Sequence, residues 1–447
     1  MILCRTALVD GQFVDDVAVG VDDRGFISEI LTGEPITTAY DVDGVVVPGF
    51  VNTHSHLFHR ALRGAGEGED FWSWRTEMYR LAGRLDPDGY HRLAIGVFGE
   101  MLDAGYTSVG EFHYVHHRPD GRPYPGHEME LAVAWAAIEA GIRLTLLDTC
   151  YLHAGFGAPL EPAQVRFGDG SAEGWVDRWH RLADALPRSP LVSLGAAVHS
   201  VRAVSPEEMD AAVDGLPDDV PLHVHLSEQP AENRACQQAT GLTPTAVLER
   251  AGVLSPRTTA VHATHLTDDD IDALAASRTT VSLCPTTEAD LGDGIARVAD
   301  LLDAGVALCI GTDEDVVTDP FAELRLLESG ARLIGGRRGV VPSEELWAIG
   351  SRVSSLLPGV GRAERAGLRV GDPADMVAVS PRSSRLAGVP PQRWPLVASA
   401  ADVTATIVGG RVVPGGSTRR LVAALDELRG LPAELRGEHP ELRGDGR

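Results

Sequence analysis

Two histidines separated by one residue, His54 and His56, follow an apolar run at residues 45–47. On a β-strand, residues two positions apart face the same side. Two imidazoles on one side can bind the same metal ion, because neutral imidazole is a common ligand of Zn²⁺. Short patterns of this kind also occur by chance. The pair alone is therefore consistent both with a metal site and with two ordinary histidines on a strand.

Three later apolar runs also end in histidine or aspartate. They are residues 221–228 with His225 and Glu228, residues 261–265 with His262 and His265, and residues 308–313 with Asp313. Polar groups at the carboxyl ends of parallel strands meet at one end of a β/α barrel, where barrel enzymes carry their catalytic groups. Together with the first pair, these runs predict one metal-dependent catalytic site.

The order of these residues resembles the amidohydrolase superfamily, in particular its metal-dependent deaminases. The resemblance implies four metal ligands, His54, His56, His225 and Asp313. Three imidazoles and one carboxylate suit Zn²⁺, with iron or manganese as alternatives. Because the sequence contains no lysine, it cannot form the carboxylated lysine that bridges two metals in binuclear members. We therefore expect one Zn²⁺ per chain.

The same resemblance implies three catalytic residues. Glu228 occupies the position of the family's acid and base, and a solvated loop glutamate is the alternative interpretation. His262 corresponds to a histidine that contacts the metal-bound water; His265 lies close by, and we choose His262 because it directly follows an apolar pair. Asp313 would hold the metal and accept a proton from the water, whose pKa the metal lowers to near neutrality. Such a site can attack a carbon double-bonded to nitrogen while Glu228 protonates the leaving nitrogen.

Four longer motifs resemble the formimidoylglutamate deiminases of histidine degradation. They lie at residues 105–117, 152–157, 284–294 and 323–328, and the resemblance spans about residues 45–415. That family hydrolyses N-formimidoyl-L-glutamate, a dicarboxylate with one amidine, to N-formyl-L-glutamate and ammonia. We therefore expect a small dicarboxylate as substrate.

The resemblance also implies four substrate-binding residues. His199 and Arg202 match a histidine and an arginine that meet a substrate carboxylate, for which the guanidinium fork is suited. A surface ion pair is the alternative for Arg202. Tyr114 matches a tyrosine that reaches the substrate, and His59 stands where the family often has glutamine. After the metal aspartate, residues 314–315 are Glu-Asp where the family often has Ser-His, so two carboxylates are added beside the site.

The composition excludes several other classes of protein. The formal net charge of −25 disfavours nonspecific binding to nucleic acid or anionic membranes. All 39 basic residues are arginine, which excludes lysine Schiff-base chemistry and a Walker A lysine. The same charge repels an anionic substrate at long range, so a local arginine or histidine must bind it.

Several features bear on location and partners. No run of about 18 apolar residues is present, and the first residues lack the layout of a signal peptide. Five scattered cysteines do not suggest a disulfide framework. These observations predict a cytoplasmic protein without membrane contact, and the resemblance implies a homodimer.

Apolar runs alternate with helix-like segments through the middle of the chain, which predicts an α/β fold with a (β/α)₈ TIM-like barrel. The predicted barrel strands lie at residues 45–47, 107–112, 143–147, 191–198, 223–226, 260–262, 281–284 and 307–311. Predicted helices between them include residues 131–140, 244–251 and 268–276. Strand-like runs near both ends predict a small β-sandwich domain formed by both termini, as the resemblance also implies.

These patterns predict four segments along the chain. They are the N-terminal part of the small β-domain at residues 1–47, the barrel at residues 48–365, the C-terminal part of the small β-domain at residues 366–418, and a helix and tail at residues 419–447.

Three other functions stay open. The first is another deaminase of the superfamily that acts on guanine, cytosine or an adenosine derivative, although Arg202, His199 and Tyr114 favour a carboxylate over a planar ring. The second is a noncatalytic metal-binding or regulatory relative, against which the intact catalytic set argues. The third is a hydrolase that removes chloride or an acyl group.

Overall fold

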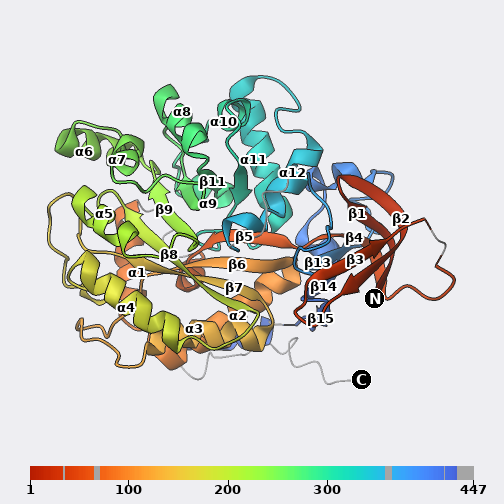
Figure 1. Cartoon of the computed structure of the whole chain (residues 1–447), viewed down its shortest axis with the longest axis horizontal. Coiled ribbons are helices and arrows are strands. Elements are labelled where there is room, and N and C mark those ends of the chain that lie inside the picture. The colour runs from red at the N-terminus through yellow and green to blue at the C-terminus, as the bar shows by residue number, and fades with distance from the viewer. Residues whose placement is uncertain (34–35, 65–70, 358–364, 417, 430–447) are drawn as a thin grey trace.

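The computed structural model describes residues 1–33, 36–64, 71–357, 365–416 and 418–429. Eight parallel strands form a nearly closed barrel, and seven strands from the two ends of the chain form a second sheet beside it (Figure 1). The predicted fold, a β/α barrel with a small β-domain built from both termini, is confirmed. The predicted tail beyond residue 429 lies outside the described residues.

The barrel strands are neighbours in chain order. Their bounds are β5 Phe50–Ser55, β6 Tyr106–His113, β7 Arg143–Cys150, β8 Val192–Ser200, β9 Leu222–Leu226, β10 Thr258–His262, β11 Thr280–Leu283 and β12 Leu308–Ile310. Every residue of these strands except the start of β8 is buried, which explains the continuous apolar runs in the sequence. The amides of Thr312 and Asp313 donate to the carbonyl of His54, at 3.0 and 2.9 Å, and connect β12 to β5.

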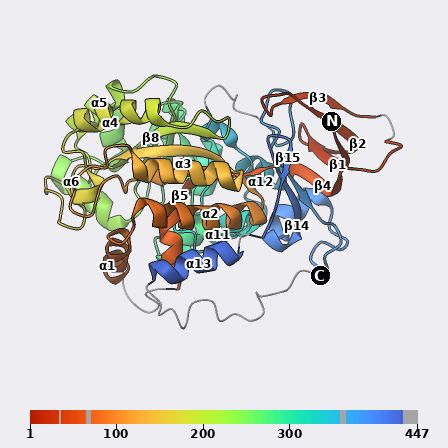
Figure 2. The ribbon, with the colours of Figure 1, turned by 90° about the horizontal axis from the view of Figure 1, so that it is seen from below.

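Helices cover the outside of the barrel (Figure 1). Their bounds are α1 Phe71–Ala82, α2 Pro87–Ala104, α3 Glu128–Ala140, α4 Ala172–Ala185, α5 Pro206–Asp214, α6 Pro230–Thr240, α7 Pro244–Arg250, α8 Asp268–Ser277, α9 Pro285–Asp290, α10 Val298–Asp303, α11 Pro320–Gly335, α12 Ser343–Gly350 and α13 Thr418–Leu428. Several begin with a side-chain cap followed by proline, as at Asp86, Ser205, Thr243 and Asp319, so the sequence marks where they start. The last helix, α13, packs against α2 under the barrel (Figure 2).

The second sheet joins the two ends of the chain in the order β15-β14-β13-β4-β1-β2-β3. The bounds are β1 Ile2–Val9, β2 Gln12–Val21, β3 Ile27–Leu31, β4 Val42–Pro48, β13 Met376–Val379, β14 Val403–Val408 and β15 Arg411–Val413. Strand β4 pairs antiparallel with β13, which brings both ends into one sheet. Arg143 at the start of β7 donates to Asp375 at 2.8 and 3.0 Å and ties this sheet to the barrel.

One strand assignment from the sequence is wrong. Residues 45–47 belong to β4 of the second sheet, and the first barrel strand is β5, which begins at Phe50. The pair Pro48-Gly49 separates two apolar strands that the hydrophobic pattern alone reads as one. A Cβ atom at Gly49 would lie 2.1 Å from the Thr107 hydroxyl, so only glycine lets the chain pass this close to β6.

Candidate active site

The carboxyl ends of the barrel strands bring the predicted polar side chains together. His54, His225 and His262 lie on β5, β9 and β10, and His56, Glu228 and Asp313 follow β5, β9 and β12. All of them except His54 line one cavity of about 630 Å³. Ser227, His262 and Asp313 all have positive φ angles, of 50°, 70° and 49°. Such left-handed conformations are uncommon outside glycine and occur often at functional sites.

Three histidines and one aspartate point their donor atoms at a common centre. His54 Nε2 lies 3.2 Å from His225 Nε2 and 3.3 Å from Asp313 Oδ1, and His56 Nε2 lies 3.4 Å from the same oxygen. Donor atoms that each bind one Zn²⁺ at about 2.0–2.2 Å lie roughly this far from one another. The four residues that the sequence predicted as metal ligands therefore fit a single divalent cation.

The histidines of this cluster are held in the neutral form that binds metals. His56 Nδ1 donates to the carbonyl of Phe112 and His225 Nδ1 donates to the carbonyl of His199, each at 2.9 Å, which leaves both Nε2 atoms unprotonated toward the centre. Burial, with His54 nearby, lowers the pKa of His56 to about 3, and burial also lowers the pKa of His54 and His225. Neutral imidazoles facing one carboxylate form a donor set for a cation.

His262 and Glu228 stand beside this cluster. His262 Nε2 lies 3.9 Å from Glu228 Oε1 and 3.9 Å from Asp313 Oδ2, and its Nδ1 lies 3.6 Å from Glu288. Although burial opposes its charged form, these carboxylates raise the pKa of His262 to about 10. His265, the other histidine of this run, instead donates to the carbonyl of Asp293 at 2.8 Å and does not line the cavity.

The predicted substrate-binding residues line the same cavity. Tyr114 shares a hydrogen bond of 3.0 Å with His59, the histidine that stands where the family often has glutamine, and both residues line the cavity. Arg202 follows β8 and lies 3.5 Å from Glu232 on α6, with 28% of its side chain exposed. Burial, with the charge of Arg202, lowers the pKa of His199. Arg202 therefore lines the cavity while its guanidinium lies next to the carboxylate of Glu232.

Sequence reasoning missed a second arginine of the cavity. Arg75 lies on α1 and lines the cavity together with Trp74, Tyr79 and Tyr151. It lies outside the strand-end motifs, on a helix that folds over the barrel mouth. The one sequence signal for Arg75 is its place in residues 71–75, a short stretch that contains two tryptophans and this arginine.

The two carboxylates of the 314–315 pair have different environments. Asp315 accepts hydrogen bonds from Ser55 at 3.2 Å and from Thr312 at 2.5 Å, which gives it a structural role at the end of β12. Glu314 lines the cavity. Burial and the nearby charge of Asp313 raise the pKa of Glu314 to about 10.

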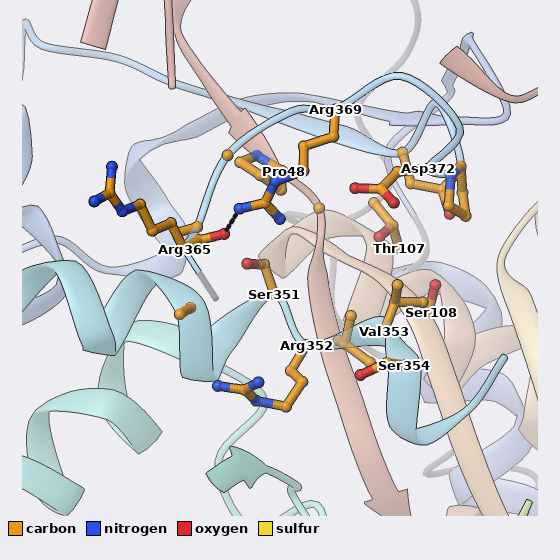
Figure 3. A pocket seen from close by; sticks show the side chains of 17 residues that line it. Pro48, Thr107, Ser108, Ser351, Arg352, Val353, Ser354, Arg365, Arg369 and Asp372 are labelled. Carbon is orange, nitrogen blue, oxygen red and sulfur yellow. Dashed lines mark hydrogen bonds between the residues drawn. The ribbon is translucent and has the colours of Figure 1, made fainter. Parts of the chain in front are cut away.

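Another cavity, of about 610 Å³, lies where the amino ends of β5 and β6 meet the segment before β13 (Figure 3). Arg369 donates to the carbonyl of Arg365 and lies 3.7 Å from Asp10, and Arg352 donates to the carbonyl of Leu308 at 2.7 Å. None of the described residues that line it is a histidine. Because the histidines and the carboxylates His56, His225, His262, Glu228 and Asp313 line the other cavity, we assign the chemistry to the cavity at the barrel mouth.

Comparison with known proteins identifies the family. The model of the amidohydrolase family matches residues 45–413. The chain belongs to the amidohydrolase family. Among relatives of this amidohydrolase, a formimidoylglutamate deiminase from Pseudomonas aeruginosa is 36% identical and aligns with 96% of the chain and 99% of the relative. An 8-oxoguanine deaminase from the same species is 29% identical over 92% of each chain.

Solved structures show the same fold. An amidohydrolase from Brucella melitensis superposes with a TM-score of 0.88 at 33% identity, covering 96% of this chain and 99% of the other. An adenosine deaminase from Xanthomonas campestris with bound zinc superposes with a TM-score of 0.81 at 22% identity, covering 96% and 97%. The family match and the 36% identical relative show that this amidohydrolase is a hydrolase, and the solved structures show the same barrel fold. Among the described residues, no helix combines the length and the apolar character needed to cross a bilayer.

Proposed function

We propose that this amidohydrolase hydrolyses the amidine of N-formimidoyl-L-glutamate to N-formyl-L-glutamate and ammonia. One observation carries the proposal: the cavity combines a hydrolytic set, Glu228, His262 and Asp313, with two arginines, Arg75 and Arg202. The relative that is a formimidoylglutamate deiminase, at 36% identity across nearly the whole chain, supports the same reaction.

We propose one Zn²⁺ per chain, held by His54, His56, His225 and Asp313. When bound, such an ion would supply a Lewis acid and lower the pKa of a water molecule. The donor distances of 3.2–3.4 Å and the neutral histidines support this assignment. The zinc in a solved structure of an adenosine deaminase with the same fold also favours it.

The chain's own residues then divide the proton transfers. Asp313 Oδ2 faces His262 at 3.9 Å, so a water between them can give a proton to the aspartate while the histidine orients it. The oxygen of that water forms the new bond to the amidine carbon, and the bond from this carbon to the terminal nitrogen breaks. Glu228 lies 3.9 Å from His262 and lines the cavity, so it can take the remaining proton of the attacking oxygen and deliver it to the leaving nitrogen, which departs as ammonia while that oxygen becomes the formyl carbonyl.

The substrate carboxylates require local positive charge, because the net charge of −25 repels a dianion at long range. Arg202 and Arg75 supply it within the cavity, and Tyr114 and His199 add hydrogen-bonding groups. Arginine suits this role because its planar fork binds a carboxylate through two parallel hydrogen bonds.

The experiment is a panel assay of ammonia release by the purified protein. The substrates are N-formimidoyl-L-glutamate, guanine, 8-oxoguanine, cytosine and adenosine. We expect the highest kcat/KM for N-formimidoyl-L-glutamate. A higher kcat/KM for an uncharged ring would contradict the proposal and favour a purine or pyrimidine deaminase.

A further inference from the structure

Gln164 is a fully buried amide that is hydrogen-bonded to two tyrosines of the cavity at the barrel mouth. Its Oε1 atom accepts the backbone N–H of Glu161 at 2.9 Å. Because a backbone N–H can only donate, this bond fixes which end of the amide is the oxygen. The other end, Nε2, therefore donates to the hydroxyl oxygens of Tyr79 and Tyr151, each at 2.9 Å.

These bonds fix the direction in which the Tyr151 hydroxyl donates. The hydroxyl oxygen of Tyr79 accepts from Gln164 and also from Arg75 Nε, at 2.8 Å. With two bonds accepted, this oxygen cannot also accept the hydroxyl hydrogen of Tyr151. Any bond between the two phenols must therefore run from Tyr79 to Tyr151. The described residues offer no other acceptor to the Tyr151 hydroxyl, so its hydrogen is left for a ligand.

Tyr151 presents this hydrogen at the cavity. It lines the cavity, and its ring packs edge-on against that of His199 with the ring centroids 4.3 Å apart. The charges of Arg202 and Arg75, which line the same cavity, act on its hydroxyl. Burial, with Tyr79 nearby, raises the pKa of Tyr151, so the phenol keeps its proton at neutral pH and can donate it to a hydrogen bond.

The barrel places this donor next to Arg202. Tyr151 directly follows β7, Arg202 follows β8, and these two parallel strands are neighbours in the sheet. A neutral donor and a cationic donor at adjacent strand ends suit a group that accepts hydrogen bonds and carries a negative charge. A carboxylate has both properties, whereas a carboxamide would turn N–H groups toward these donors.

We propose that Tyr151 donates its hydroxyl hydrogen to the substrate carboxylate that Arg202 binds, and that Gln164 is the positioning residue that keeps this hydroxyl directed at the substrate. The inference rests on the proposed function, because the carboxylate belongs to N-formimidoyl-L-glutamate. Gln164 itself stays behind the two phenols, where its amide nitrogen offers them donors and no acceptor. It would act on the substrate only through Tyr151.

The test changes the hydrogen-bonding character of position 164 while keeping its size. Gln164→Glu presents an acceptor in place of the amide nitrogen, so the Tyr151 hydroxyl would donate to position 164 instead of to the ligand. Gln164→Met removes the amide without adding a charge, and Tyr151→Phe removes the hydroxyl itself. The matched control is Tyr106→Phe, because Tyr106 is a buried tyrosine at the amino end of β6, away from the cavity at the barrel mouth.

Two measurements are made on the wild type, on these variants and on the double variant Gln164→Glu/Tyr151→Phe. Calorimetry gives the dissociation constant of N-formyl-L-glutamate, which carries the same two carboxylates as the proposed substrate. Steady-state kinetics give kcat and KM for N-formimidoyl-L-glutamate. Metal content is measured in each sample.

We expect Tyr151→Phe and both substitutions of Gln164 to raise the dissociation constant and KM by roughly ten-fold or more, because hydrogen bonds to charged groups are strong. The value of kcat should change little, since a contact far from the reacting bond binds substrate and transition state alike. The double variant should bind no more weakly than Tyr151→Phe, because both substitutions remove the same hydrogen bond. Tyr106→Phe should match the wild type.

An unchanged dissociation constant in Tyr151→Phe would overturn the inference, as would a wild type that does not bind N-formyl-L-glutamate. Losses that add in the double variant would show that Gln164 acts independently of Tyr151 and would overturn its positioning role. A wild type that binds N-formyl-L-glutamate through Tyr151 but does not turn over N-formimidoyl-L-glutamate would refute the proposed function and leave the carboxylate contact standing.

Discussion

Glu228 lines the cavity and lies beside His262. Its side chain is 14% exposed and lies 3.9 Å from His262. It is absent from the groups of donor atoms that could hold a metal ion. These features separate proton transfer from metal binding, because substitution of Glu228 leaves the four proposed ligands in place.

We predict that Glu228→Gln lowers kcat by about 10²- to 10⁴-fold and leaves the metal content unchanged, because general acid–base groups contribute to this extent. Steady-state kinetics and elemental analysis of the same sample check it. The matched control is Glu249→Gln, an exposed glutamate on α7 that should keep full activity. An unchanged kcat in Glu228→Gln would remove this residue from the mechanism.

Arg202 contributes a charge both to the cavity and to a buried carboxylate. We predict that Arg202→Met lowers kcat/KM for N-formimidoyl-L-glutamate by roughly ten- to a few-hundred-fold, because charge-assisted hydrogen bonds are worth about 1.5–3 kcal/mol. Metal content should not change. Since the substitution also leaves Glu232 without its partner at 3.5 Å, the double variant Arg202→Met/Glu232→Gln serves as the control for folding. Full activity of Arg202→Met would disprove the carboxylate-binding role.

At the residue scale, the sequence located groups that follow strands and missed those that come from helices. His54, His56, His225 and Asp313 were predictable because each ends an apolar run, and parallel strands end together. Arg75 reaches the cavity from α1, and no local pattern reports how a helix folds over the barrel mouth. The structure brings the predicted groups together, and their catalytic and ligand roles stay predictions.

At the element scale, the contact between β12 and β5 sets the distance between His54 and Asp313. A Cβ atom at Gly311 would lie 2.8 Å from both the Cβ atom and the carbonyl oxygen of His54. The glycine lets the segment that carries Asp313 pack directly against the strand that carries His54. The approach of these two side chains therefore depends on the absence of a side chain at position 311.

We predict that Gly311→Ala destabilises the fold by about 1–3 kcal/mol, because an added methyl group in a packed interior forces a shift of the backbone. The metal content should fall as well, since His54 and Asp313 would separate. Denaturant unfolding and elemental analysis check both effects. Gly155→Ala is the control, because a Cβ atom there meets no other atom within 4 Å. Unchanged stability would show that the two strands tolerate a wider separation.

A buried ionic network behind β6 and β7 fixes helix α4 to the barrel. Arg178 of α4 donates to Asp169 at 2.8 and 3.0 Å and to Asp148 at 2.8 and 2.9 Å. His117 lies 3.0 Å from the same Asp169. Although burial opposes ionisation, the hydrogen bond from His117 and the charge of Arg178 hold the pKa of Asp169 well below its usual value.

We predict that Asp169 makes the free energy of unfolding depend on pH in the acid range. A lowered folded-state pKa stabilises the fold above the unfolded value of about 3.9, and this contribution disappears as the pH falls through the folded value. Asp169→Asn should lower the free energy of unfolding by about 1.5–3 kcal/mol at pH 7. The difference in this free energy between the wild type and the variant should become smaller below about pH 4. Unfolding curves at several pH values test this, with Asp184→Asn on the exposed side of α4 as control. A difference that is independent of pH would contradict it.

Most elements could be predicted because buried parallel strands form uninterrupted apolar runs. The exception at residues 45–47 has a physical reason, since β4 and β5 are consecutive apolar strands that belong to different sheets. Hydrophobicity reports burial and gives no information about which sheet buries a strand. Strand β4 pairs with β1 and with β13, and β13 lies more than 300 residues later, where no local pattern connects the two strands.

At the scale of the whole molecule, long-range and local electrostatics act in opposite directions. The chain carries −25, yet the proposed substrate is a dicarboxylate. In the proposed function, Arg75 and Arg202 would provide the compensating charge inside the cavity, where solvent screening is weakest. The homodimer and the cytoplasmic location stay predictions.

The absence of lysine removes one way of holding two metals at one site. A carboxylated lysine cannot bridge two ions in this chain, and the two groups of candidate donor atoms at the barrel mouth, His54-His56-His225 and His54-His262-Asp313, share His54. We predict one Zn²⁺ per chain in active protein, measured by elemental analysis against protein concentration. Two tightly bound metals per chain would contradict the single-ion site.

Metal removal should also lower stability, because an ion that binds only the folded state stabilises it in proportion to the logarithm of its concentration. Without the ion, Asp313 faces two neutral histidines at 3.3 and 3.4 Å. We expect dialysis against a chelator to abolish activity and lower Tm by several degrees, with both restored by one equivalent of Zn²⁺. As the control, His54→Asn should show the lower Tm without any response to zinc. A chelated wild type that keeps its Tm and its activity would refute the metal site at His54, His56, His225 and Asp313.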